Sequence, residues 1–139
     1  VAAGADDDFT IEADIPGVGT FTFSAPLPAA FVGGAGFRDN GDGLESAPVD
    51  ISWTPADDDA LMDLHLRANH HRRVGFSSCR LDDSVGEVTA TAAIIDPLRP
   101  TTGFEGGDAR RSFVGHVVTA AGCIEVAVVR SEPIFPRFE

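Results

Sequence analysis

The segment RDNGDGLESAPVD contains the residues of this sequence that are best suited to holding a metal ion. Asp39, Asn40 and Asp42 bring side-chain oxygens close together along the chain, and a glycine follows both Asn40 and Asp42. Ca²⁺ takes about six to eight oxygen ligands, and glycine permits the sharp turn that a binding loop needs. The three residues are therefore the candidate metal ligands, and calcium is the one cofactor that the sequence suggests.

The same segment resembles the D-x-N-G-D-G loop of dockerin-type and EF-hand-type calcium sites. On that resemblance Arg38 falls at the first ligand position and Val49 at the last, and neither residue carries a carboxylate. Asp39 or Asp50 compensates only in a different geometry. The alternative is a glycine-rich turn in which Asn and Asp side chains bond to the nearby backbone. Both interpretations stay open.

Two runs of three aspartates, Asp6–Asp8 and Asp57–Asp59, form a second group of candidates. Adjacent carboxylates repel one another unless water or a cation separates them. Water can do so in a turn beside a strand, so solvated turns are predicted and a cation site is the alternative. The histidines lack the spacing typical of a zinc or copper site. They are His65, His70, His71 and His116.

The sequence lacks the motifs that bring a nucleophile and a base together. It has no G-x-S-x-G motif and no phosphate-binding loop. Aspartates are abundant, but nothing in the pattern selects a pair suited to glycoside hydrolysis. The sequence therefore predicts that the protein is not an enzyme.

The chain has 139 residues and a net charge of −12, which arises from 22 acidic residues and ten arginines. That length predicts a single domain, 1–139, with a core of its own. Residues 1–63 hold 13 acids and one arginine, whereas residues 64–139 hold nine of each, so the excess negative charge lies in the first half. Such a surface repels nucleic acid and can attract cations or a basic partner, and the alternative is that the acidic loops only keep the protein soluble. No run approaches the roughly 18 apolar residues of a membrane span, so a protein partner or self-association is expected without direct membrane insertion.

Cys79 and Cys123 are the only cysteines, and their spacing is not that of a metal site. In an exported protein they can form one disulfide, whereas in the cytosol they are two small buried residues. The printed sequence starts at Val1, which fits either a removed secretory signal or a trimmed boundary. We therefore expect a disulfide between Cys79 and Cys123 and an extracellular or cell-surface location.

Apolar and polar residues alternate along much of the chain, which is the pattern of half-buried β-strands. Eight such runs with turn signals between them predict an all-β, antiparallel two-sheet sandwich of about eight strands. The segment 57–71 is the only helix candidate, and its apolar positions fit a period of two better than the helical period of about 3.6. The predicted strands are 9–15, 20–26, 49–53, 62–68, 74–81, 87–95, 112–118 and 123–129, with glycine- and proline-rich loops at 27–48 and 96–108.

The segment VDISWTPADDDALMDLHLRA resembles the B and C strands of fibronectin type III and related immunoglobulin-like domains. In those domains a Trp on the second strand, followed by Thr-Pro, fills the core, and here the matching residues are Trp53, Thr54 and Pro55. Together with SSCRLDDSVGEVTATAAII, the segment is similar to uncharacterised secreted W-T-P sandwich proteins of GC-rich bacteria. The resemblance implies an immunoglobulin-like sandwich over about 20–132, with 9–15 as an extra leading strand. We expect Trp53 to be buried between the sheets beside Phe21 or Phe23.

These observations predict a non-enzymatic, exported module with a structural or adhesive role at the cell surface. A subunit of an extracellular assembly is one version of this role, because an acidic half can dock on the neutral half of a second copy. The alternative is a calcium-dependent module that binds carbohydrate or protein. Exposure of Phe37 or Phe104 to solvent would favour this alternative.

Overall fold

A computed structural model of the chain describes residues 8–37, 48–56, 59–70, 73–95, 104–134 and 137–138. These residues form strands, one 3₁₀ turn and one short helical turn, which confirms the all-β prediction. The strands are β1 (Asp8–Ile15), β2 (Gly19–Pro26), β3 (Gly33–Phe37), β4 (Val49–Trp53), β5 (Leu61–His70), β6 (Arg73–Asp82), β7 (Glu87–Ala90), β8 (Phe104–Thr119), β9 (Gly122–Ile134) and β10 (Arg137–Phe138).

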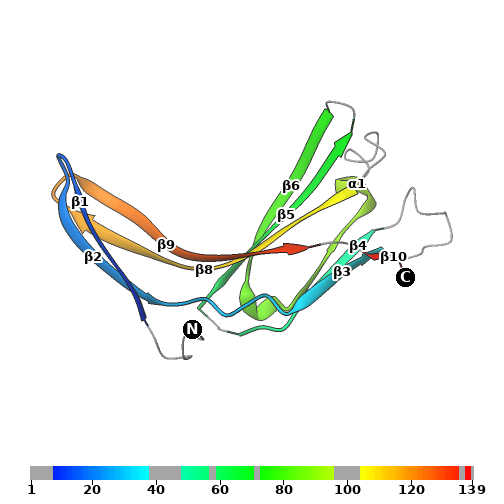
Figure 1. The fold of residues 1–139 in the computed structure, drawn as a ribbon, viewed down its shortest axis with the longest axis horizontal. Helices are drawn as coiled ribbons and strands as arrows, with labels where there is room; N and C mark the ends of the chain where they lie inside the picture. The colour runs from blue at the N-terminus through cyan, green and yellow to red at the C-terminus, as the bar shows by residue number, and fades with distance from the viewer. Residues whose placement is uncertain are drawn as a thin grey trace.

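The strands are arranged in three sheets (Figure 1). β1 and β2 form a separate hairpin, while β10-β3-β4-β7 and β6-β5-β8-β9 form two sheets of four strands each. Neighbouring strands are antiparallel except for β10, which runs parallel to β3. The predicted leading strand 9–15 is therefore present as β1, and the turn that follows it reverses the chain into β2 as expected.

One hydrophobic cluster draws its residues from both four-stranded sheets. Every second residue of β4, and of β5 from Met62 to Leu66, belongs to it, as the alternation predicts. Full burial of a Val, Leu, Ile or Met side chain stabilises the fold by roughly 1.5–3 kcal/mol relative to an exposed side chain. The buried members are Ala35, Val49, Ile51, Trp53, Met62, Leu64, Leu66, Ala90, Ala109 and Ile134.

Two segments that the sequence predicts to be loops contain strands. β3 lies within 27–48, and the first part of β8 lies within 96–108. In both places glycine permits a neighbouring backbone to come very close: a Cβ on Gly33 would meet the carbonyl oxygen of Ser52, and one on Gly107 would meet that of His65. Glycine here marks close strand packing, which composition alone cannot separate from a loop.

Two further segments test the distinction between helix and strand. The segment 57–71 contains β5, which confirms the strand interpretation. The predicted strand 87–95 is wrong in its second half, because β7 ends at Ala90 and the helical turn α1 (Ala92–Ile95) follows. The amide of Ile94 donates to the carbonyl of Thr91 there, and the paired alanines are strong helix formers.

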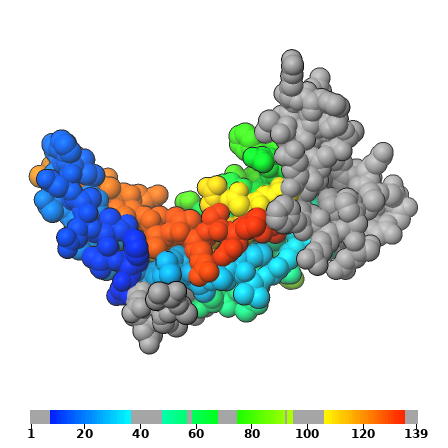
Figure 2. Space-filling view, viewed as in Figure 1, coloured from blue at the N-terminus to red at the C-terminus, as the bar shows by residue number. Residues whose placement is uncertain are grey.

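β8 and β9 extend far beyond the hydrophobic cluster (Figure 1). β5 pairs with β8 only as far as Ser112, whereas β9 pairs with it to Thr119. The hairpin β1–β2 lies beside this outlying part, and the blue and orange end of the molecule stands clear of the rest in Figure 2. We call residues 8–26 and 113–128 the arm.

Candidate functional site

Arg111 of β8 forms a buried ion pair at the base of the arm. Its Nε donates to Oδ1 of Asp83 over 2.9 Å, and the two side chains are 1% and 0% exposed. The remaining guanidinium nitrogens donate to the carbonyls of Ala29, Ala30 and Thr54 at 2.8–3.0 Å. Because each nitrogen of the buried cation has an acceptor, the pair avoids the large penalty of an unsatisfied buried charge.

Asp83 receives contacts from the end of β4 as well. Its second carboxylate oxygen accepts from the amide of Ala56, and its carbonyl accepts from Trp53 Nε1, each over 2.8 Å. Arg111 and Asp83 together therefore join β8, the end of β4, the 3₁₀ turn Asp83–Val85 and the chain that leaves β2. These contacts fix the direction in which the arm leaves the core, which is a structural role.

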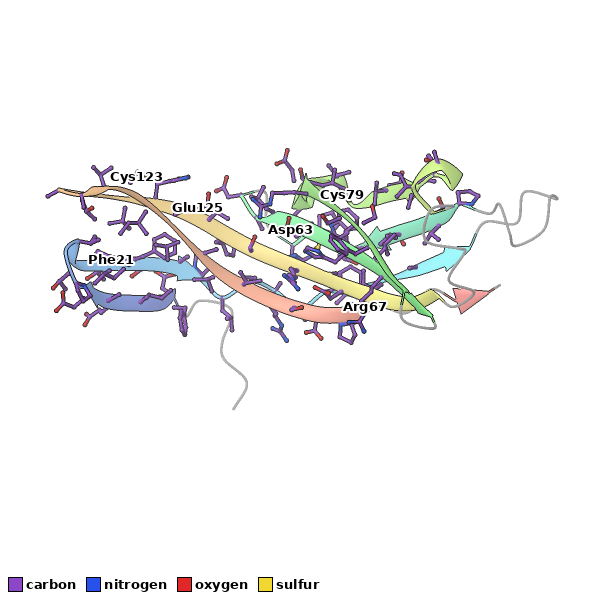
Figure 3. The ribbon with its side chains drawn as sticks, turned by 90° about the horizontal axis from the view of Figure 1, so that it is seen from above. Phe21, Asp63, Arg67, Cys79, Cys123 and Glu125 are labelled. Atoms are coloured by element: carbon purple, nitrogen blue, oxygen red, sulfur yellow. The ribbon has the colours of Figure 1, made fainter. Side chains whose placement is uncertain are left out.

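Trp53 is 5% exposed, so its predicted burial is confirmed. The phenylalanine packed against its cluster is Phe31. The expectation of Phe21 or Phe23 as its neighbour is wrong, because both belong to the hairpin, on which Figure 3 labels Phe21. Phe23 lies over Gly115 of β8. Phe31 escaped the prediction because it stands in a segment without alternation.

The two layers of the arm pack through the faces that point toward each other. A Cβ on Gly115 would collide with the ring of Phe23, so glycine here lets the hairpin sit directly on β8. Alternate residues of all four strands are half-buried, and most of their neighbours are exposed. The half-buried set includes Ile11, Ala13, Phe21, Phe113, Val117, Ile124 and Val126.

The other face of β8 and β9 in the arm carries apolar side chains in contact with water. Val118 is 84% exposed, and Val129, just beyond the arm on the same face of β9, is 50% exposed. Between them His116 and Glu125 lie opposite each other, with Nε2 and Oε2 3.7 Å apart on exposed side chains. The two valines lie on one face with the polar pair between them, so a partner that covers this face removes apolar area from water.

The two cysteines do not form the predicted disulfide, since both are free and exposed. Cys79 lies opposite Leu64, which lies opposite Ala109, whereas Cys123 lies opposite Val118, nine residues farther along β8. At about 3.3 Å per residue this separates them by roughly 30 Å, far beyond the ~7 Å limit between bridged Cα atoms. Figure 3 shows the two residues on different parts of the molecule. The prediction rested on the even number of cysteines and on the inferred export, and neither brings two distant strands together.

The predicted calcium ligands Asp39, Asn40 and Asp42 lie outside the described residues, so the calcium site stays a prediction. Of the two aspartate runs, Asp8 and Asp59 are described, and both are exposed. Within the described ranges, no group of three or more His, Cys, Asp or Glu side chains is arranged to hold a metal ion. Phe37 and Phe104 are described only in their backbone, so their exposure is untested.

No protein-family model matches the chain, and no curated protein or solved structure matches it. Among the described residues, no helix has both the length and the apolar character needed to cross a membrane. Function therefore has to be inferred from the residues of the chain itself.

Proposed function

We propose that the protein is a non-enzymatic, exported structural or adhesive module that acts at the cell surface as a subunit of an extracellular assembly. The observation that carries this proposal is the arm, in which two long strands and a hairpin extend beyond the core. The arm exposes Val118 beside the pair His116–Glu125 on one face and the carboxylates of β1 on the other, and it adds little to the buried core. Exposed apolar surface lowers the solubility of a protein unless a partner covers it.

The strand order supports an immunoglobulin-like sandwich as the body of the module. In that fold strands A, B and E form one sheet, and strands C, F and G form the other, with C′ able to extend it. Here β3, β4 and β7 take the positions of A, B and E, while β6, β5, β8 and β9 take those of C′, C, F and G. Trp53 lies on the second strand of this series, as in fibronectin type III domains.

The buried charges support a structural role rather than a catalytic one. Arg111 and Asp83 satisfy each other and nearby backbone groups, and their side chains are closed off from solvent. A group that binds a substrate must reach it, whereas these two groups hold four segments of the chain together. The fold alone does not choose a function, so the proposal rests on the arm.

Chemical cross-linking on producing cells, followed by fractionation, tests this proposal. We expect the chain in the surface fraction, within complexes larger than one chain. Recovery of an uncross-linked monomer in the cytosol would contradict both the location and the role.

A further inference from the structure

The edge of β8 that faces away from β9 is open over Phe113–Thr119. β5 occupies this edge up to Ser112 and then ends, while β9 continues along the other edge to Thr119. In the described part of the chain, no backbone group outside the β8–β9 ladder bonds to these seven residues. An open edge presents unpaired amides and carbonyls that can accept another strand.

This edge lacks the features by which proteins protect open strands. Charged side chains, proline and bulges are the usual protection, and residues 112–124 contain no Asp, Glu, Arg or proline. By contrast, the free edge of β9 carries Glu125, Arg130 and Pro133, and that of β6 carries Arg80 and Asp82. The edge of β8 is the less protected one.

The free edge of β2 is also uncharged, but its side chains differ. Thr20, Thr22 and Ser24 point away from the arm's interior and are exposed, and Ser24 bonds to Thr10. Their hydroxyls bond well to water, so covering them gives little driving force. On β8 the corresponding outward residues include Val114 and Val118, and Val118 is almost fully exposed.

We propose that Phe113–Thr119 pairs with the same segment of a second copy of this chain, antiparallel about a two-fold axis near His116. Such a contact is self-complementary, as a two-fold interface must be. Val114 of one copy then lies opposite Val118 of the other, and each covers the other's exposed surface. The result is a continuous sheet in the order β9-β8-β8-β9 across the two copies.

The lack of Asp, Glu and Arg in this segment makes it the place where a second copy is repelled least. Two molecules with a net charge of −12 repel each other, and the repulsion is weakest where their contact surface carries no charge. The paired segment Phe113–Thr119 has no Asp, Glu or Arg, and the carboxylate of Glu125 on the neighbouring strand lies beside His116, 3.7 Å from its Nε2. Added salt should therefore strengthen the association, whereas salt would weaken the binding of a basic partner.

The inference rests on the proposed function, because it names the surface through which the module assembles. Sedimentation velocity on the purified full chain tests it, with Val118→Lys as the main variant. This change makes the net charge less negative, so long-range repulsion falls and only a local effect can weaken the dimer. We expect the dimer Kd to rise about tenfold or more, since the change occurs twice in each dimer.

Two matched variants serve as controls. Val129→Lys places the same charge on the same face of the pair β8–β9, but on β9. Thr22→Lys places it on the outer face of β2. Both should dimerise like the wild type, and circular dichroism should show all three variants folded. A wild type that stays monomeric, a Val118→Lys protein that dimerises normally, or a control that is equally impaired would each overturn the edge pairing. The proposed function survives any of these results if producing cells still hold the chain in larger surface complexes.

Discussion

Arg111 Nε and Asp83 Oδ1 lie 2.9 Å apart with both side chains shielded from water, whereas the similar pair Arg80–Asp63 lies at 2.8 Å with Arg80 55% and Asp63 17% exposed. The two ion pairs have similar N–O distances, but they differ in what they contribute to the fold. The buried pair positions four segments at the base of the arm, and the exposed pair bridges only two neighbouring strands.

Replacing Arg111 by Met should lower the free energy of unfolding by about 3–5 kcal/mol, because Asp83 is left buried without its cation. Arg80→Met should have little effect, since water and salt already screen that pair. Urea denaturation followed by circular dichroism measures both. Equal losses in the two variants would contradict the assigned role of the buried pair.

Trp53 is the sole tryptophan, so its fluorescence reports directly on the core. We expect emission that is insensitive to iodide in the native protein and becomes quenchable on unfolding. Trp53→Ala should destabilise the protein by about 3–5 kcal/mol through the cavity it creates. Trp53→Phe keeps most of the volume but removes the Nε1 donor to the Asp83 carbonyl, at a cost of about 1–3 kcal/mol. Strong quenching of native Trp53 would show that the core is misassigned.

Gly115 sets the distance between the two layers of the arm. Gly115→Val should push the ring of Phe23 aside and loosen the hairpin β1–β2, while the core retains its stability. Hydrogen exchange should then speed up in residues 8–26 and stay unchanged in β4 and β5. Combining Gly115→Val with Phe23→Ala should restore part of the protection, because the two side chains compete for one space. An unaltered exchange rate in the hairpin would refute this packing.

Both cysteines should react as free thiols in the folded protein, with two labels per chain by mass spectrometry. Although Cys79 is exposed as a residue, partial desolvation of its thiol, and then the negative charge of Asp63, raise the pKa of that thiol. The thiolate is the reactive form, so labelling of Cys79 near pH 8 should be slow and should accelerate as pH rises. Asp63→Asn removes the charge, lowers that pKa and should speed the reaction. A protein that takes up no label until it is reduced would show that Cys79 and Cys123 form a disulfide after all.

The alternating runs predicted the core strands well. Val49, Ile51 and Trp53 alternate with polar residues and are buried, as are Met62, Leu64 and Leu66. β3 and the start of β8 were missed because their glycines, which permit close packing, look like loop residues in composition. The alternation thus identified those strands that bury one face against other side chains and expose the opposite face.

The candidate site was harder to predict, because it depends on how far strands extend past their partners. The pattern identified 112–118 as a strand but gave no sign that β5 stops at Ser112. Arg111 offered a signal that could have been used: it stands on the apolar side of the alternation, between Ala109 and Phe113. An arginine at such a position needs a buried acid, and only the tertiary fold shows that this acid is Asp83.

Hydrogen exchange of Phe113–Thr119 at low and high protein concentration tests most directly whether the arm acts by edge pairing. In a single copy, amides that point away from β9 have no strand partner and should exchange fast. Pairing with a second copy should slow these amides as concentration rises, while the amides of β2 keep their rates. Exchange in this segment that is independent of concentration, or protection that arises in the hairpin instead, would contradict the proposal.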